Sequence, residues 1–176
     1  TDKNITSYIV KVSSNNIEIG VDIISDMLMN SKFRQDDFEK EKNIVVEEVN
    51  KGRDQPGNQI LENLYELVFE GHQLGHSVGG YEEIIRNYNL KDVKAYFDRF
   101  YISQNITIAV CTNLDKNIIV NHITSYFKDF INNTDFVEPK IDNHIINTQP
   151  RFKLLEKDLE QIHLAIGFPT VSMHNK

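Results

Sequence analysis

The sequence has one cysteine, Cys111, no tryptophan and only four prolines among its 176 residues. A single cysteine excludes an internal disulfide and favours a reducing compartment. No apolar run approaches the roughly 18–20 residues that a membrane-spanning helix requires. The composition therefore excludes disulfide-stapled proteins and proteins that span a membrane.

The chain also has fewer basic residues than acidic ones. The chain carries 19 Lys and Arg against 26 Asp and Glu, for a formal net charge of −7. Its basic residues are interleaved with acidic ones and form no basic face of the kind that neutralises phosphates, which excludes nucleic acid as a partner. A hydrophobic share of 40% with 26% charged residues is typical of a soluble globular protein.

The spacing of apolar residues predicts both helices and strands. In the first predicted helix, Ile17, Val21 and Ile24 recur at helical spacing after an amide cap at Asn16. Helices are predicted over residues 16–30, 36–53, 58–70, 81–87, 90–101 and 115–131. Segments rich in β-branched and aromatic residues predict strands over residues 6–12, 105–112, 152–155 and 162–168. Because the strands and helices do not alternate regularly, they predict an α+β fold: a mixed sheet with helices packed on it, truncated at both ends.

The periodicity also predicts a domain boundary. It is lost between residues 132 and 150, where Asn, Asp and Pro dominate, and such a composition is typical of a linker. Residues 1–131 are then the remainder of one domain, and residues 151–176 form the first strand or strands of a following domain.

The helix predicted over residues 36–53 carries two carboxylates on one stripe. Glu41 and Glu48 are seven residues apart, so they lie within about 20° of each other and about 10 Å apart along the axis. At the border of an apolar face, one carboxylate can ligate a metal while the other orients a neighbouring ligand. Glutamates at this spacing are also common on solvated helices, where Lys42 or Lys51 would pair with them. Spacing alone leaves both interpretations open.

Two histidines, His72 and His76, have the four-residue spacing that places paired zinc ligands on one helix face. The glycines around them disfavour a helix, so the alternative is a surface loop with solvated or loop-bracing histidines. Cys111 is predicted to lie in a buried apolar strand as a small hydrophobic residue, and not to act as a nucleophile.

The order of several motifs resembles a known family. Residues 41–48, EKNIVVEE, are similar to the segment E-K-x-V-V-x-x-E of the pitrilysin and mitochondrial-processing-peptidase family of zinc metallopeptidases (peptidase family M16, the inverzincins). Residues 22–28, DIISDML, resemble its D-I-L-x-D-M-L helix, and residues 72–75, HQLG, resemble its H-P-L-G loop. The matching segments cover essentially the whole chain in the family's order.

The resemblance implies roles for two residues and a metal. Glu48 would be a zinc ligand and Glu41 a supporting active-site acid. In this family the motif H-x-x-E-H supplies two histidine ligands and the glutamate that activates water. It precedes the ligand glutamate by roughly 75 residues, which places it before residue 1. The chain is therefore expected to be an interior fragment that is inactive and binds zinc poorly by itself.

The resemblance also implies an activity for the parent protein. That activity is zinc-dependent endopeptidase cleavage of unfolded peptides or presequences, with a second family half in the same chain or in a partner subunit. The expected compartment is intracellular, either the bacterial cytoplasm or the mitochondrial matrix.

Two alternatives remain open from the sequence. The first is a non-catalytic paralogue that serves as a structural or substrate-binding partner of an active subunit. The second is a generic α+β interaction domain with chance motif matches. This second alternative predicts that Glu48 does not face a cavity beside the N-terminal strand.

Overall fold

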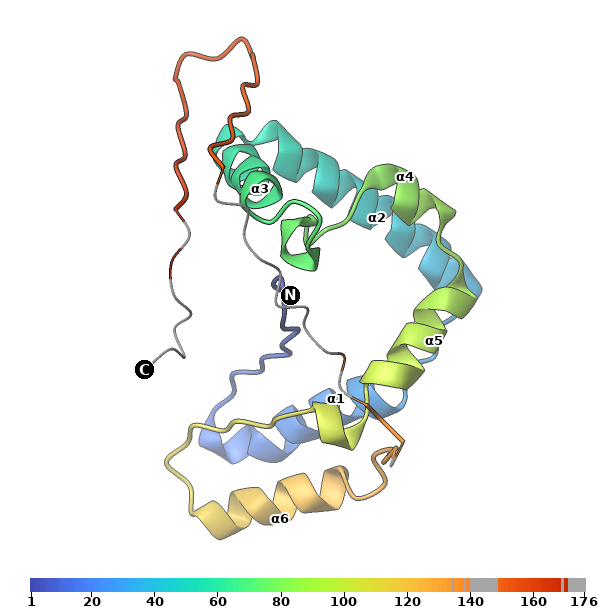
Figure 1. The fold of residues 1–176 in the computed structure, drawn as a ribbon. Helices are drawn as coiled ribbons and strands as arrows, with labels where there is room; N and C mark the ends of the chain where they lie inside the picture. The colour runs from blue at the N-terminus through green and yellow to red at the C-terminus, as the bar shows by residue number, and fades with distance from the viewer. Residues whose placement is uncertain (134, 138, 140–148, 169, 171–176) are drawn as a thin grey trace. The chain divides into compact units, whose positions relative to one another are not determined.

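The computed structural model describes residues 1–133, 135–137, 139, 149–168 and 170 (Figure 1). Its α-helices and shorter 3-10 helices, in chain order, are η1 (Ser14–Asn16), α1 (Ile17–Met29), α2 (Gln35–Asp54), α3 (Pro56–Val68), η2 (Gln73–Gly75), α4 (Glu82–Asn87), α5 (Leu90–Phe100), η3 (Ser103–Asn105) and α6 (Lys116–Tyr126). All six predicted helices are confirmed. The sixth is shorter than predicted, because it ends at Tyr126 and not near residue 131.

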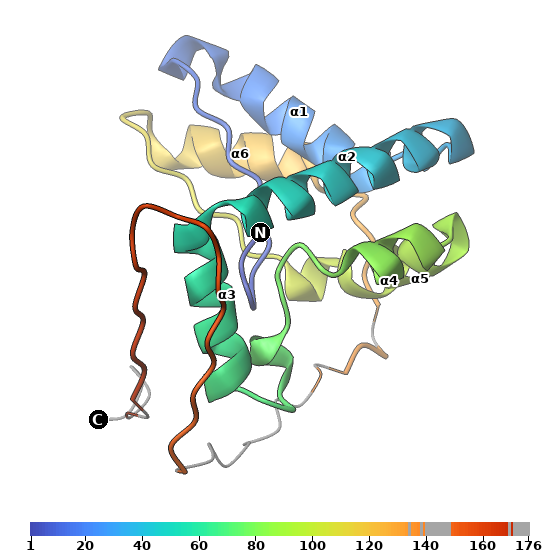
Figure 2. The ribbon, with the colours of Figure 1, turned by 90° about the horizontal axis from the view of Figure 1, so that it is seen from above.

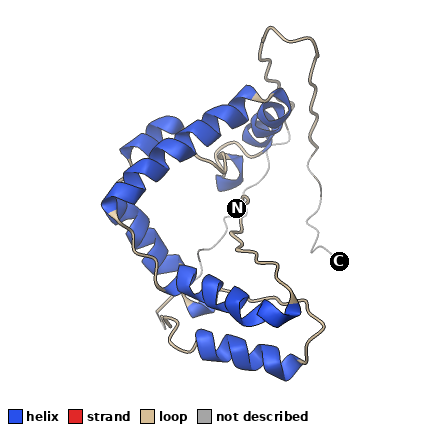
Figure 3. Ribbon diagram, turned by 180° about the vertical axis from the view of Figure 1, so that it is seen from behind, coloured by secondary structure: helices blue, strands red, loops and turns tan. Residues whose placement is uncertain are grey.

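The predicted α+β fold class is wrong, because no β-strand occurs among the described residues and the regular structure there is entirely helical (Figure 3). The β-branched segments adopt extended backbone, but a strand also requires a ladder of hydrogen bonds to a neighbouring strand. In the first of these segments, side chains lie against a helix instead. A Cβ built on Gly20 of α1 would lie 3.3 Å from methyl carbons of both Val10 and Val12.

The predicted domain boundary stays a prediction. Much of the predicted linker over residues 132–150 lies outside the described residues, as does the end of the segment 151–176. Contacts divide the chain into two compact units. One contains residues 1–6, 39–87 and the described part of 140–176, and the other contains residues 7–38 and the described part of 88–139.

The second unit is built from α1, α5 and α6. Helices α1 and α6 pack on each other, and the Tyr126 hydroxyl donates a hydrogen bond of 3.1 Å to Glu18. The Ile102 side chain is fully buried in this unit, at 0% exposed. Beside it, Tyr101 stacks on Phe97 at a centroid distance of 4.2 Å.

The first unit positions the site described below, and its frame is α2 from residue 39 onward, α3 and α4 (Figure 2). Pro56 occupies the first turn of α3, where its missing N–H costs nothing. Helix η2 packs against α3 so closely that a Cβ on Gly75 would lie 2.6 Å from the Phe69 carbonyl oxygen, which leaves room only for glycine. Asn50 of α2 donates a hydrogen bond of 3.0 Å to Glu82 at the start of α4.

None of the described helices combines the length and the apolar character that crossing a bilayer demands.

Candidate functional site

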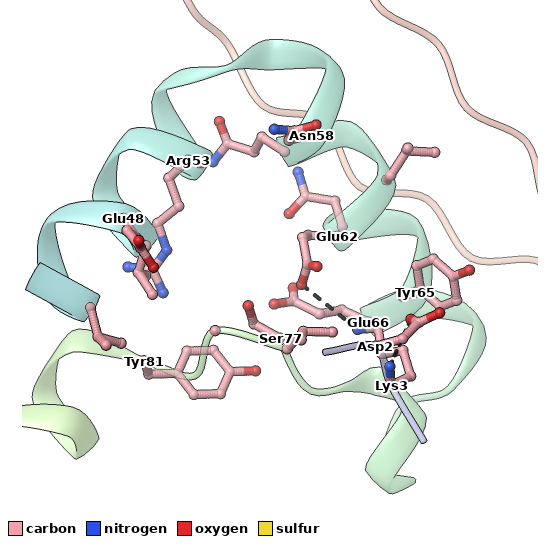
Figure 4. A pocket seen from close by; sticks show the side chains of 18 residues that line it. Asp2, Lys3, Glu48, Arg53, Asn58, Glu62, Tyr65, Glu66, Ser77 and Tyr81 are labelled. Carbon is pink, nitrogen blue, oxygen red and sulfur yellow. Dashed lines mark hydrogen bonds and ion pairs between the residues drawn. The ribbon is translucent and has the colours of Figure 1, made fainter. Parts of the chain in front are cut away.

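A cavity of about 680 Å³ lies between the N-terminal residues, α2, α3 and the loop that follows η2 (Figure 4). We name it the Glu48 cavity. Asp2 and Lys3 contribute from the N-terminus, and residues 77–79 with Tyr81 contribute from the loop. Gly80 in that loop has a positive φ of 82°, a conformation that glycine adopts without strain. The four elements belong to the same compact unit.

Glu48 reaches the cavity because of the face that α2 buries. Val46 is buried, and its neighbours Val45 and Val49 line the cavity with Glu48. Glu48 therefore stands at the edge of an apolar face, as its spacing predicts, and its side chain is exposed. Among the residues that the structure describes, it has no hydrogen bond and no ion pair, so its carboxylate is available to a ligand.

Glu41 does not line the cavity. It is exposed on α2, two turns before Glu48, and about 10 Å separates the two residues along the helix axis. The structure therefore places only one carboxylate of the predicted pair in the cavity wall. The supporting role of Glu41 stays a prediction.

Lys3 holds the N-terminal residues against the cavity wall. Its Nζ lies 3.8 Å from Glu62 and 4.7 Å from the ring centre of Tyr65, both on α3, and it donates a hydrogen bond to the His76 carbonyl. The Lys3 side chain is only 12% exposed. Sequence reasoning missed this arrangement, because no spacing pattern connects residue 3 with partners some sixty to seventy residues away.

The cavity is acidic overall. Its walls contain the carboxylates of Asp2, Glu48, Glu62 and Glu66 and the cations of Lys3 and Arg53. The Arg53 guanidinium lies 5.9 Å from the ring centre of Tyr81. Because Lys3 is already paired with Glu62, the lining favours a cation or a polar ligand with few negative charges.

The two histidines brace the loop, as the loop interpretation predicts. His72 is buried, and its Nδ1 accepts a hydrogen bond of 3.1 Å from the Leu74 amide. His76 packs edge-on against Tyr81, with ring centres 6.3 Å apart. The prediction for Cys111 is wrong in one respect: the residue is exposed and not buried, because no strand among the described residues lies beside the segment 105–112 to cover it.

The donor set fits zinc only in part. A carboxylate oxygen such as that of Glu48 is a common zinc ligand, and a catalytic site needs three protein ligands. Within the described residues, no group of three or more His, Cys, Asp or Glu side chains is placed to hold a metal ion. These residues therefore offer one ligand, and a complete site needs donors from elsewhere in the protein.

Two family models match the chain. Residues 1–82 match the model for the insulinase family (peptidase family M16), and residues 87–176 match the model for the M16 peptidase inactive domain. All the residues that line the Glu48 cavity therefore lie within the match to the insulinase family. The match excludes the interpretation of a generic domain with chance motif matches.

Similar proteins carry related names. An uncharacterized zinc protease of Bacillus subtilis, YmxG, is 26% identical over 171 residues, covering 96% of this chain and 40% of that protein. An uncharacterized zinc protease of Rickettsia bellii is 27% identical over 173 residues, covering 97% of this chain and 40% of that protein. The chain thus spans about two fifths of the length of these relatives.

A solved structure shares the fold. The crystal structure of a protease from Helicobacter pylori superposes with a TM-score of 0.69 at 18% identity, over 73% of this chain and 32% of that one. The family models, the relatives and this fold agree with the motifs around Glu48. The chain belongs to the M16 peptidase family.

Proposed function

We propose that this chain is part of a zinc-dependent endopeptidase that cleaves unfolded peptides or presequences, and that Glu48 is the zinc ligand it contributes. The observation that carries the proposal is the place of Glu48, in the wall of a cavity of about 680 Å³ that the N-terminal residues also line (Figure 4). The names of the relatives, which are zinc proteases, support the same chemistry.

In this proposal Glu48 would hold the metal through a carboxylate oxygen, and Glu41 would support the site from the same stripe of α2. Zinc bound there would supply Lewis-acid activation of water and of the scissile carbonyl. The remaining protein ligands come from residues outside this chain. By itself, the chain is inactive and binds zinc weakly, because one carboxylate does not make a zinc site.

The other residues of the cavity would bind and orient the peptide. The side-chain amides of Asn58, Gln59 and Asn63 line the wall and can exchange hydrogen bonds with a peptide main chain. The side-chain oxygen of Gln59 is buried without a hydrogen-bond partner among the described residues. The rings of Tyr65 and Tyr81 offer apolar surface for substrate side chains.

The test uses the complete protein and a neutral variant of the ligand. Glu48→Gln keeps the shape of the side chain but removes the charge that holds zinc. We expect it to lose the stoichiometric zinc, measured by elemental analysis, and to lose cleavage of an unfolded fluorogenic peptide by about 100-fold or more. Glu41→Gln is expected to weaken zinc binding or activity by about 10–100-fold.

Glu47→Gln is the matched control, because Glu47 is an exposed neighbour on α2 that does not line the cavity. It should retain both zinc and activity. Full zinc and full activity in Glu48→Gln would refute the proposed role. A complete wild-type protein with neither zinc nor cleavage would instead support the alternative of a non-catalytic partner of an active subunit.

The proposal includes two further expectations. A second family half, in the same chain or in a partner subunit, completes the peptide-binding chamber, and the enzyme works in the bacterial cytoplasm or the mitochondrial matrix. Size-exclusion chromatography with light scattering on the complete protein, and cell fractionation, check these two expectations.

A further inference from the structure

Residues 151–157 run along α3 in the same compact unit as the Glu48 cavity, and we name them the strap (Figure 2). Its side chains alternate between two sides, as in any extended segment. Arg151, Lys153 and Lys157 face the helices, whereas Phe152 and Leu154 are 83% and 69% exposed. Because side chains alternate with a period of two in an extended chain, the three basic residues lie on the side of the strap that faces the helices.

The two ends of the strap bind the C-termini of two helices. Arg151 donates a hydrogen bond of 2.6 Å to the Leu67 carbonyl in the last turn of α3, and it lies 2.9 Å from Glu70. Lys157 donates a hydrogen bond of 3.2 Å to the Arg53 carbonyl in the last turn of α2. Carbonyls in the last turn of a helix lack intrahelical donors and carry the negative end of the helix dipole, so a cation is well placed on each of them.

The length of the strap matches this arrangement. Six residue steps of extended chain span about 20 Å. Helix α3 has 13 residues and is also about 20 Å long. Because α3 begins two residues after α2 ends, a segment anchored at the end of α3 reaches the end of α2 when it runs back along α3.

Between these anchors, Lys153 pairs with a residue of the cavity wall. Its Nζ lies 2.6 Å from Glu66, and both side chains are partly exposed. Glu66 and Arg53 both line the Glu48 cavity. The strap thus touches two residues of the cavity wall, one through a side chain and one through its main-chain carbonyl.

The returning part of the chain also rests on α3. A Cβ built on Gly167 would lie 3.0 Å from Val68 and 3.1 Å from Leu64, so the backbone there lies directly against the helix. Two extended segments therefore cover one side of α3, while its other side lines the cavity.

We propose that the strap locks the α2–α3 wall of the Glu48 cavity, with Lys153 as a positioning residue that holds Glu66 in place. Lys3 neutralises Glu62 and Lys153 neutralises Glu66, so the two acidic residues that α3 contributes are both paired. Glu48 is then left as the α2 carboxylate that faces the cavity without a partner among the described residues.

The first test measures amide hydrogen exchange across α3. Lys153→Glu places two negative charges together and is expected to speed exchange in residues 56–70 by about threefold or more, because the helix opens locally more often. Arg151→Ala is expected to do the same in the last turn of α3. The charge swap Lys153→Glu with Glu66→Lys should restore exchange to within about twofold of wild type.

Lys40→Glu is the matched control for charge, since Lys40 is exposed on α2 in the same unit. It should leave exchange in α3 unchanged. Lys153→Gln removes the charge without adding repulsion, and it serves if Lys153→Glu does not fold. Exchange in α3 that is the same in Lys153→Gln, Arg151→Ala and Lys40→Glu as in wild type would overturn the proposal.

The second test is kinetic and rests on the proposed function. In the complete protein, Lys153→Gln should raise KM for a peptide by about threefold or more with little change in kcat, and the charge swap should reverse this effect. An unchanged KM overturns the positioning role of Lys153. Failure of the proposed function is seen separately, as full activity in Glu48→Gln, and the exchange measurements do not depend on it.

Discussion

Replacing Lys3 by Met tests whether the N-terminal residues form part of the cavity wall. Methionine keeps the unbranched shape of the side chain but removes its charge and its three donors. Lys3 contacts the His76 carbonyl, the Tyr65 ring and the Glu62 carboxylate, and all three contacts lose their charged partner.

The expected loss follows from these contacts. A hydrogen bond made by a charged group contributes about 1.5–3 kcal/mol to stability. A partly desolvated cation–π contact contributes about 0.5–2 kcal/mol. The pair with Glu62 adds little by direct attraction at 3.8 Å, but its loss leaves a buried Glu62 oxygen with no positive neighbour. Since these contributions overlap, we expect Lys3→Met to lower the free energy of unfolding by about 2–4 kcal/mol.

Urea denaturation followed by circular dichroism measures the loss. With a slope of about 2 kcal/mol/M, the midpoint should fall by about 1–2 M. Lys40→Met is the control, because Lys40 is exposed on α2, and it should change the free energy of unfolding by less than about 0.5 kcal/mol. The double variant Lys3→Met with Glu62→Met removes both partners and should recover part of the loss. If Lys3→Met is as stable as Lys40→Met, the N-terminal residues are not held in the wall and the reasoning fails.

Three further predictions concern stability and pH. Ile102→Ala should cost about 2–5 kcal/mol, and Ile102→Val about 0.5–1.5 kcal/mol, in the same urea assay, because the side chain is fully buried; equal losses would contradict the packing. Burial, with the hydrogen bond to Tyr8, raises the pKa of Tyr101, so the folded state keeps a proton that the unfolded chain loses. Stability should therefore fall as the pH rises above about 10, and Tyr101→Phe should flatten this slope in urea titrations at increasing pH. Hydrogen bonds from Asn50 and Arg86 lower the pKa of Glu82, so their stabilisation is present at neutral pH and is lost as the pH falls below about 4. Asn50→Ala should reduce the shift of the thermal midpoint between about pH 7 and about pH 3; an unchanged shift would show that the bond does not form.

The helices could be predicted from the sequence because their apolar spacing is local information. Helix α1 begins at Ile17 and ends at Met29, within a residue or two of the prediction. The cap was predicted less well: Asn16 is the N-cap of α1, but its side chain makes no capping hydrogen bond. Asn16 is also the last residue of the 3-10 turn η1, and its φ of −115° and ψ of 17° are not the extended backbone that a capping residue usually has, which spacing does not reveal.

The predicted strands failed for a different reason. Extended backbone is a local preference of β-branched residues, whereas a strand exists only with a partner. Val10 and Val12 pack on α1, and Gly167 lies against α3. A strand pattern in the sequence therefore could not distinguish sheet pairing from packing on a helix.

One residue of the candidate site could be predicted from the sequence. Glu48 was found through the motif around it, and the structure places it in a cavity wall. Lys3 and Lys153 were not found, because each binds a carboxylate of α3 from a distant part of the chain. A single ion pair between remote residues leaves no periodic signal in one sequence.

The N-terminal residues of the cavity wall have a practical consequence for handling the protein. Because Asp2 and Lys3 lie in that wall, any residues joined before Thr1 leave the chain at the cavity that Glu48 also lines. An N-terminal polyhistidine tag would bring imidazoles within reach of that carboxylate and assemble an artificial metal site. Zinc titrations of this chain by itself should therefore use protein from which such a tag has been removed.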